Sequence, residues 1–126
     1  MAKFVADAVL DAALNHIKNN ATKLHVCSTS PTTYAEASST YQLASAVIDT
    51  GDFTGPADHT SGRKLTVAAQ SGMTVTASGT AAHIALTNGT DTLYYVTEID
   101  TDTALVDNDS NTCSTSSWII SIADPT

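Results

Sequence analysis

Apolar residues near the start of the chain recur with the spacing of an α-helix. The stripe consists of Ala6, Leu10, Ala13, Leu14 and Ile17, at positions i, i+4, i+7, i+8 and i+11. Asp7 and Asp11 lie toward the start of this segment and Lys18 toward its end, an order that complements the helix dipole. Asn19-Asn20 can adopt the left-handed conformation that often ends a helix. The pattern predicts a helix over about residues 6–18, preceded by a short arm.

After this segment the apolar period changes to two, which is typical of β-strands. The predicted strands cover residues 23–27, 43–48, 63–69, 73–77, 82–86, 93–99, 104–106 and 117–123. Turns are expected at Ser71-Gly72, Ser78-Gly79 and Asn88-Gly89, of which the last is the strongest hairpin signal. Seven or eight short strands at this spacing indicate a mainly β protein: an antiparallel, jelly-roll-like β-sandwich with one N-terminal α-helix.

The alternating strands predict a single hydrophobic core. Its expected members are Leu65, Val67, Val75, Ile84, Leu86, Trp118 and Ile120. Two stretches of small and polar residues, 28–40 and 50–62, are predicted to be long loops, the first with a helical turn at Tyr34–Ala37. No repeat or linker divides the chain, so residues 1–126 are expected to form one domain, with an arm and helix over 1–20 and a sandwich over 21–126.

Charge limits the classes of partner. The chain has 13 Asp and Glu residues against 5 Lys and Arg, a formal net charge of −8. Nucleic-acid binding and binding to anionic membranes both depend on clustered cations, so neither partner is expected. No apolar run approaches the roughly 20 residues that span a bilayer. Acids at Asp7 and Asp11 also argue against a signal peptide.

Residues that could carry chemistry are sparse. Cys27 and Cys113 lie far apart, and we expect two buried free thiols, with a disulfide as the alternative. The histidines, His16, His25, His59 and His83, share no ligand spacing. His83 is expected at the surface or rim of a strand. No nucleophile elbow, phosphate loop or dinucleotide fingerprint occurs. We therefore predict a protein that is not an enzyme, with no catalytic residue, no cofactor and no metal.

One segment resembles the start of a calcium loop. Asp107-Asn108-Asp109-Ser110-Asn111 has the D-x-D-x-N pattern that can wrap a hard cation. However, Thr112 stands where an EF-hand needs Gly, and Trp118 where it needs Glu. A solvated hairpin turn is the favoured interpretation, and the paired carboxylates Asp100 and Asp102 also fall in a predicted turn.

Aromatic and apolar residues near the predicted loops and arm are candidates for contacts with partners. Trp118 alternates in phase with Ile120 and Ile122 and is assigned to the core. Of the neighbours Tyr94 and Tyr95, one ring should point away from the core, because adjacent strand residues face opposite ways. The candidate interface residues are Phe4, Val5, Tyr34, Tyr41, Phe53, Tyr94 and Tyr95.

Five segments are similar to a family of small tailed-bacteriophage proteins. They are Ala6–Asn15, Leu24–Ser28, Pro31–Ala37, Gly79–Gly89 and Ile122–Pro125, which together extend over nearly the whole chain. These elements are structural and contain no catalytic set. Such proteins tend to be encoded among head and tail structural genes, so the resemblance implies a virion component, assembled in the host cytoplasm. It implies in particular a decoration (cement) protein on the capsid exterior.

The expected function is therefore a contact. The partners would be the major capsid protein or other virion proteins, together with further copies of this chain on the particle. We expect the arm, the helix and the loops at 28–40 and 50–62 to make these contacts. The alternative is a tail or head-fibre module that binds host-surface glycans through exposed aromatic rings. A small hydrolase is a third class, for which no motif is present.

Overall fold

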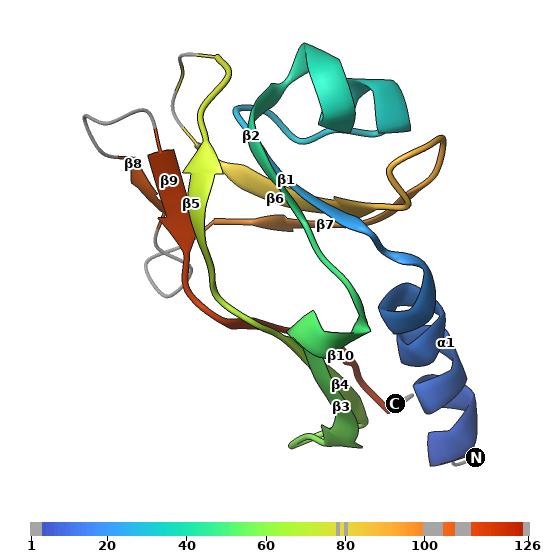
Figure 1. Cartoon of the computed structure of the whole chain (residues 1–126). Coiled ribbons are helices and arrows are strands. Elements are labelled where there is room, and N and C mark those ends of the chain that lie inside the picture. Colours follow the sequence, from blue (N-terminus) through green and yellow to red (C-terminus); the bar gives the residue numbers. More distant parts are fainter. Residues whose placement is uncertain (1–3, 78, 80, 100–104, 108–111, 125–126) are drawn as a thin grey trace.

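The computed structural model describes residues 4–77, 79, 81–99, 105–107 and 112–124, with backbone alone at 105–107 and 112. Within these residues the helix α1 (Asp7–Asn20) precedes ten strands (Figure 1). The strands are β1 (Lys23–Cys27), β2 (Gln42–Val47), β3 (Phe53–Asp58), β4 (Arg63–Val67), β5 (Gln70–Thr74), β6 (His83–Thr87), β7 (Leu93–Glu98), β8 (Leu105–Asp107), β9 (Thr112–Thr115) and β10 (Trp118–Ile122). Short helical segments are η1 (Glu36–Thr40) and η2 (Thr50–Asp52). The prediction of a mainly β, antiparallel, sandwich-like fold with an N-terminal helix is confirmed.

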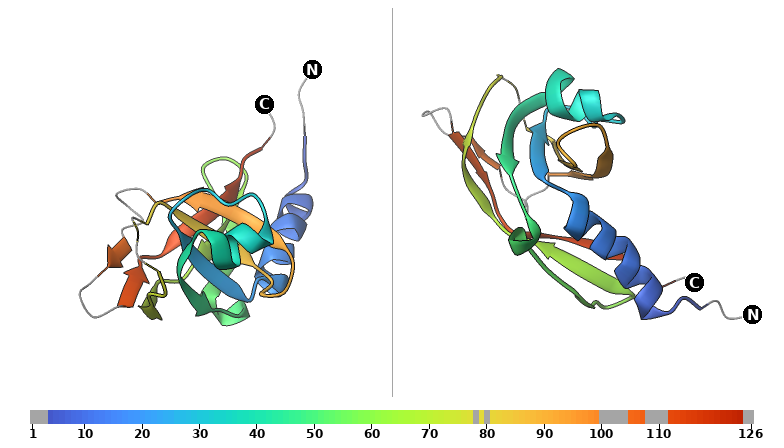
Figure 2. Two further views of the ribbon diagram at one scale, coloured as in Figure 1. Left: turned by 90° about the horizontal axis from the view of Figure 1, so that it is seen from above. Right: turned by 45° about the vertical axis from the view of Figure 1, so that its right-hand side comes forward.

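The strands form one layer of four and a second, longer layer. The first sheet has the order β2-β1-β6-β7, and the others have the orders β10-β4-β3 and β5-β9-β8. The last two sheets are nearly continuous, because β4 leads into β5 and β9 into β10. The layer bends where the two sheets meet, between the pairs Val67↔Trp118 and Gln70↔Thr115. This long curved layer is clearest in the right-hand view of Figure 2.

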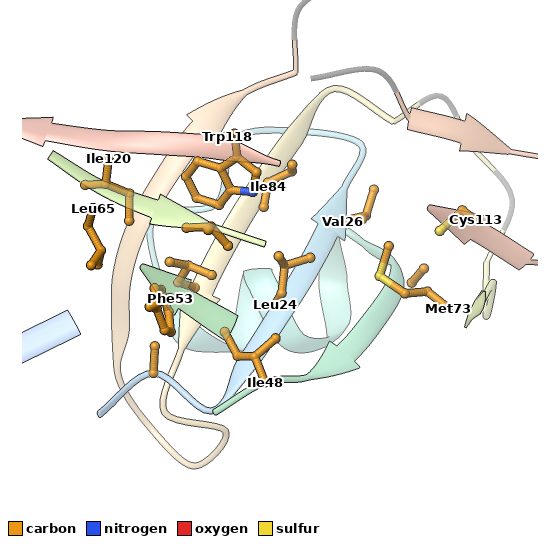
Figure 3. Packing of buried hydrophobic residues seen from close by; sticks show 14 of the residues in the cluster. Leu24, Val26, Ile48, Phe53, Leu65, Met73, Ile84, Cys113, Trp118 and Ile120 are labelled. Carbon is orange, nitrogen blue, oxygen red and sulfur yellow. The ribbon is translucent and has the colours of Figure 1, made fainter. Parts of the chain in front are cut away.

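The core lies between the two layers. Helix α1 precedes β1 in the chain and lies roughly in line with it (Figures 1 and 2). The helix is beside the four-stranded sheet and packs on the end of the long layer formed by β3 and β4. Leu14 from α1, Leu24 from β1 and Leu65 from β4 are all fully buried in one cluster. Figure 3 shows the same cluster continuing through Trp118 and Ile84 to Met73 and Cys113.

The predicted core residues occupy this cluster. Leu65, Val67, Ile84, Leu86, Trp118 and Ile120 are buried in it, and Val75 packs against it while partly exposed. Cys27 and Cys113 are also buried, and neither forms a disulfide, as predicted.

A second, smaller cluster buries the opposite face of β1 and β6. The chain after β1 turns back over this face, and η1 places Ala37 against Cys27 and Ala85. Tyr41, Leu93 and Val96 pack around these three residues. The central strands are therefore buried on both faces. The helical turn predicted within residues 28–40 is present, since Tyr34 and Ala35 are helical and lead into η1.

The prediction that residues 50–62 form a loop is wrong, because strand β3 lies within them. Phe53 is buried and pairs with Val67, and pairing resumes at Ala57↔Lys64 after an irregularity. The irregularity contains Gly55-Pro56, and proline is tolerated there because β3 is an edge strand that needs no N–H at that point. The strand was not predicted because glycine and proline in its middle are typical of loops.

Two further details of the strand prediction are wrong. Ser71-Gly72 is not a turn between strands but an irregularity inside β5, where the register shifts between Gln70 and Met73. Strand β9 was not predicted, because its sequence of Thr, Cys and Ser shows no apolar alternation. The turn predicted at residues 100–102 lies outside the described residues, as does the turn predicted at 107–111 except for Asp107, which ends β8.

Candidate contact surface

Cys27 is a structural thiol. Its side chain is fully buried under η1, and Sγ–H donates to the Ala37 carbonyl at 3.6 Å. Burial raises the pKa of this thiol to about 11. At neutral pH Cys27 is therefore protonated and is not a nucleophile.

A row of three potentially reactive residues crosses the first sheet. Cys27, His83 and Glu98 are cross-strand neighbours on β1, β6 and β7, so their side chains share one face. His83, expected at the surface or rim, is half-buried at the start of the inner strand β6, and its buried Nδ1 has no hydrogen-bond partner. No hydrogen bond or ion pair joins these three described side chains. The row therefore lacks the contacts that a thiol–imidazole–carboxylate nucleophile requires.

His25 belongs to a buried hydrogen-bond network. Its Nδ1 lies 2.6 Å from Gln42 Oε1, and its Nε2 lies 2.9 Å from Thr87 Oγ1. Because the Gln42 oxygen can only accept, Nδ1 carries the proton and the Thr87 hydroxyl donates to Nε2. Thr87 Oγ1 also accepts from the Gly89 backbone N–H at 3.1 Å. Burial lowers the pKa of His25, so the ring is neutral and structural.

Helix α1 is fixed to the long layer by packing and by charge. Leu10 and Leu14 face inward and are buried. Arg63 on β4 donates from Nε and Nη2 to both oxygens of Asp11, at 2.8 and 3.2 Å. Nη1 of the same side chain donates to Asp58. Near the other end of the helix, Lys18 Nζ donates to the Gly55 carbonyl at 2.9 Å. The helix is thus held along its length.

The end of α1 differs from the prediction. Both Asn19 and Asn20 are helical, and the following residue, Ala21, is extended with φ −73° and ψ 123°. The expected left-handed asparagine is therefore wrong. The helix ends because β1 begins almost at once, at Lys23, and pulls the chain into a strand.

The solvent face of α1 carries no charged residue. Ala8, Val9, Ala12, Ala13 and His16 are all exposed and fall on this one face. Ala13 was predicted to belong to the buried stripe and is exposed instead. Val9 is 60% exposed, and Phe4, which precedes the helix, is 86% exposed. We call Phe4, Ala8, Val9, Ala12 and Ala13 the arm–helix surface.

Phe4 is the candidate interface residue that lies most in the open. Val5 and Tyr34 are half-buried, and Tyr41 is half-buried against the second cluster. Phe53 is 5% exposed in the main core, which removes it from the candidate contact surface.

Tyr94 and Tyr95 both pack on the protein, so the prediction that one ring points away is wrong. Tyr94 lies edge-on to His16, with ring centroids 5.5 Å apart, and Tyr95 stacks on Trp118 at 5.9 Å. The register shifts between Leu86 and Thr87, which leaves Tyr94 as an extra residue in β7. Such a bulge breaks the alternation and re-aims a side chain.

The described residues show neither a metal-ion cluster nor a helix that could span a membrane. No group of three or more His, Cys, Asp or Glu side chains in this part of the chain is placed to hold a metal ion. No helix among the described residues is long and apolar enough to cross a membrane. No family model, no curated protein and no solved structure matches the chain.

Proposed function

We propose that this chain is a non-enzymatic structural protein of a tailed-phage particle, a decoration (cement) protein that docks on the capsid exterior through the arm–helix surface. The observation that carries the proposal is the uncharged solvent face of α1 with Phe4 beside it. The identity of the particle rests on the sequence resemblance described above. The docking mode rests on the exposure of Phe4 and of the uncharged face of α1.

A solvent-facing helix normally carries charges on its outer side. This chain has 13 acidic residues, yet the exposed face of α1 presents alanines, Val9 and His16, with the uncharged Asn19 and Asn20 at its C-terminal end. Asp7, Asp11 and Lys18 lie instead on the side that faces β3 and β4. A small, smooth apolar face allows close approach of a partner, and Phe4 supplies an aromatic anchor of the kind that dominates interface energies.

The rigidity of the helix supports this role. Because Arg63 and Lys18 tie α1 to β4 and β3, the face is presented in a fixed orientation. A preorganised surface loses less conformational entropy on binding than a mobile one. Many copies on one particle would add avidity to a modest single contact.

The loop over residues 28–40 offers a second contact region. It is ordered by its own hydrogen bonds: Glu36 Oε1 accepts from the Thr32 N–H at 2.8 Å and from the Thr32 hydroxyl at 2.9 Å. Tyr34 in this loop is half-buried and can contribute part of its ring. The other predicted contact loop, 50–62, contains strand β3 and is not included in the proposal.

The test is reconstitution on particles that lack the protein. Purified chain, labelled with a fluorophore, would be added to expanded capsids from a phage deleted for its gene, and occupancy measured by co-sedimentation. Phe4→Asp and Val9→Asp should each lower occupancy at least tenfold. Val47→Asp is the matched control, since Val47 is 78% exposed but lies on β2, away from the arm. Full occupancy by both arm–helix variants would overturn the docking mode, and failure of the unaltered chain to bind would overturn the decoration role.

The glycan-binding alternative finds less support. Its best candidates were exposed aromatic rings, but Tyr94, Tyr95 and Tyr41 pack on their own protein. A glycan array on the unaltered chain tests this alternative directly.

A further inference from the structure

The strand edges of the two layers are protected to different degrees. β3 carries the Gly55-Pro56 irregularity, and β7 carries a bulge and ends in Glu98. β2 is partly covered, because Thr76 N–H donates to the Leu43 carbonyl at 2.7 Å and Ala44 bridges to Val75. Bulges, prolines, charges and covering segments are the usual protections of an edge.

β10 has none of these protections. It is an edge strand, paired with β4 on one side and with no strand on the other side within the described residues. All five of its residues, Trp118–Ile122, keep one unbroken register with β4. The strand contains no charge, proline or glycine. The backbone N–H and C=O groups along its free edge are therefore regularly spaced and open to pairing with another strand.

We propose that β10 pairs with β10 of a second copy of this chain. The two strands would run antiparallel about a two-fold axis and join two three-stranded sheets into one sheet of order β3-β4-β10-β10-β4-β3. This inference concerns the isolated chain and does not depend on the role in a phage particle.

The pleat of the strand determines the register. Trp118 and Ile120 face the core, whereas Ile119 and Ser121 face outward. For both cores to lie on the same side of the joined sheet, each residue must pair with one of the same face. All five residues of each strand are paired when the two-fold axis passes next to Ile120, so that Ile120 of one copy lies opposite Ile120 of the other. Ile119 of one copy then lies opposite Ser121 of the other, and Trp118 lies opposite Ile122.

The absence of acids and the exposed apolar surface of β10 favour a second copy as the occupant. Each chain carries a net charge of −8, which opposes association in general, so a contact between two copies is least opposed at a segment without acids, and β10 is such a segment. Pairing would also cover Ile119, which is 41% exposed, and Ile122, which is partly exposed at the edge of the core. The contact is small compared with the roughly 1,000 Å² of a stable interface, so we expect a weak dimer with a dissociation constant on the order of 100 µM.

Cysteine trapping tests the register. The variants Ile119→Cys and Ser121→Cys would be mixed at high concentration and oxidised. Opposite residues in an antiparallel pair have Cα atoms about 4.5–5.5 Å apart, within reach of a disulfide. The mixture should give a cross-linked dimer and each variant alone much less, while buried Cys27 and Cys113 supply the background in the unaltered chain. Cross-linking of each variant with itself, at the level of the mixture, would overturn this register.

Charge pairs test the interface by sedimentation. Ile119→Lys with Ser121→Lys places like charges opposite each other across the axis and should abolish the dimer. Ile119→Lys with Ser121→Glu places opposite charges there and should restore it. Both double variants alter the same two outward-facing positions, and equal thermal melting would show that both are folded. An unaltered chain that stays monomeric at millimolar concentration, or two double variants that associate equally, would overturn the proposal.

Discussion

Arg63 on β4 donates hydrogen bonds to both carboxylate oxygens of Asp11 on α1, at 2.8 and 3.2 Å, although the two residues are 52 positions apart in the sequence. The Arg63 side chain is only 17% exposed and that of Asp11 27%, whereas the side chain of Asp58, another partner of Arg63, is 87% exposed. A two-point, partly buried pair is stronger than an exposed one, which solvent screens. We expect Asp11→Asn to lower the melting temperature on the order of 5 °C, and Asp58→Asn to lower it much less. Equal effects of the two variants would show that Asp11 does not tie the helix to the sheet.

The buried His25 should make stability depend on pH. Burial lowers the pKa of His25 in the folded state below the ordinary value of about 6.5 that it has when unfolded. Above about pH 6.5 the ring is neutral in both states, and folding is not penalised. Below that pH the unfolded chain takes up a proton that the folded chain resists, so stability falls by at most about 1.4 kcal/mol per pH unit until the folded-state pKa is reached.

Urea unfolding at pH 7.5, 6.5 and 5.5 measures this slope. His25→Gln lowers stability at every pH but should flatten the slope, because the titrating group is gone. His59→Gln removes a histidine from the connection between β3 and β4 and is the matched control, which should keep most of the slope. A slope that survives in His25→Gln would assign the pH dependence to other groups.

Periodicity predicted the parts of the fold in which each residue's face is set by local alternation. The helix, β1, β2, β4, β6, β7 and β10 all follow apolar patterns of period 3.6 or 2, and their inward residues meet in the predicted core. The Asn88-Gly89 turn was predictable from another local signal, the preference of Asn-Gly for tight hairpin turns. It joins β6 and β7, and Asn88 Oδ1 accepts from the backbone N–H of Thr90, Asp91 and Thr92.

The missed features depend on pairing partners that sequence alone does not reveal. β3 forms because β4 supplies the ladder, despite Gly55-Pro56 in its middle. Tyr94 and Tyr95 both pack inward because β7 has an extra residue relative to β6. Ala13 was wrongly assigned to the buried face of α1, because an alanine can lie on the buried or the exposed face of a helix at little cost in free energy. The arm–helix surface became evident only once Leu10 and Leu14 were located in the core.

Trp118 has an orphaned polar atom, which predicts an unusual substitution pattern. The ring is 7% exposed and stacks on Tyr95, but its Nε1 is buried without a hydrogen-bond partner. Trp118→Ala should destabilise by about 3–5 kcal/mol because it leaves a large cavity. Trp118→Phe keeps most of the apolar contact and removes the unsatisfied N–H, so we expect a loss of only about 1–2 kcal/mol. Urea unfolding followed by circular dichroism measures both, and equal losses would mean that Nε1 contributes a favourable contact.

Gly62 and Gly72 provide a matched pair for the last prediction, because both have positive φ, at +78° and +68°. A side chain at either position incurs the left-handed penalty of roughly 1–2 kcal/mol. At Gly62 a Cβ would also overlap the Ile122 carbonyl and lie 2.9 Å from Ala123 Cα, whereas at Gly72 it would meet nothing within 4 Å.

Gly62→Ala should therefore destabilise by at least about 2 kcal/mol more than Gly72→Ala, since backbone overlap adds to the conformational penalty. The damage should be local as well as global. Gly62 N–H donates to Asp124 Oδ2, and Asp124 N–H donates to Ser61 Oγ, so this corner holds the end of β10 against the β3–β4 connection. In Gly62→Ala, amide hydrogen exchange should accelerate first at Ser121 and Ile122, near the end of β10, and in Gly72→Ala it should not. Equal protection of these amides in the two variants would show that Gly62 does not position β10.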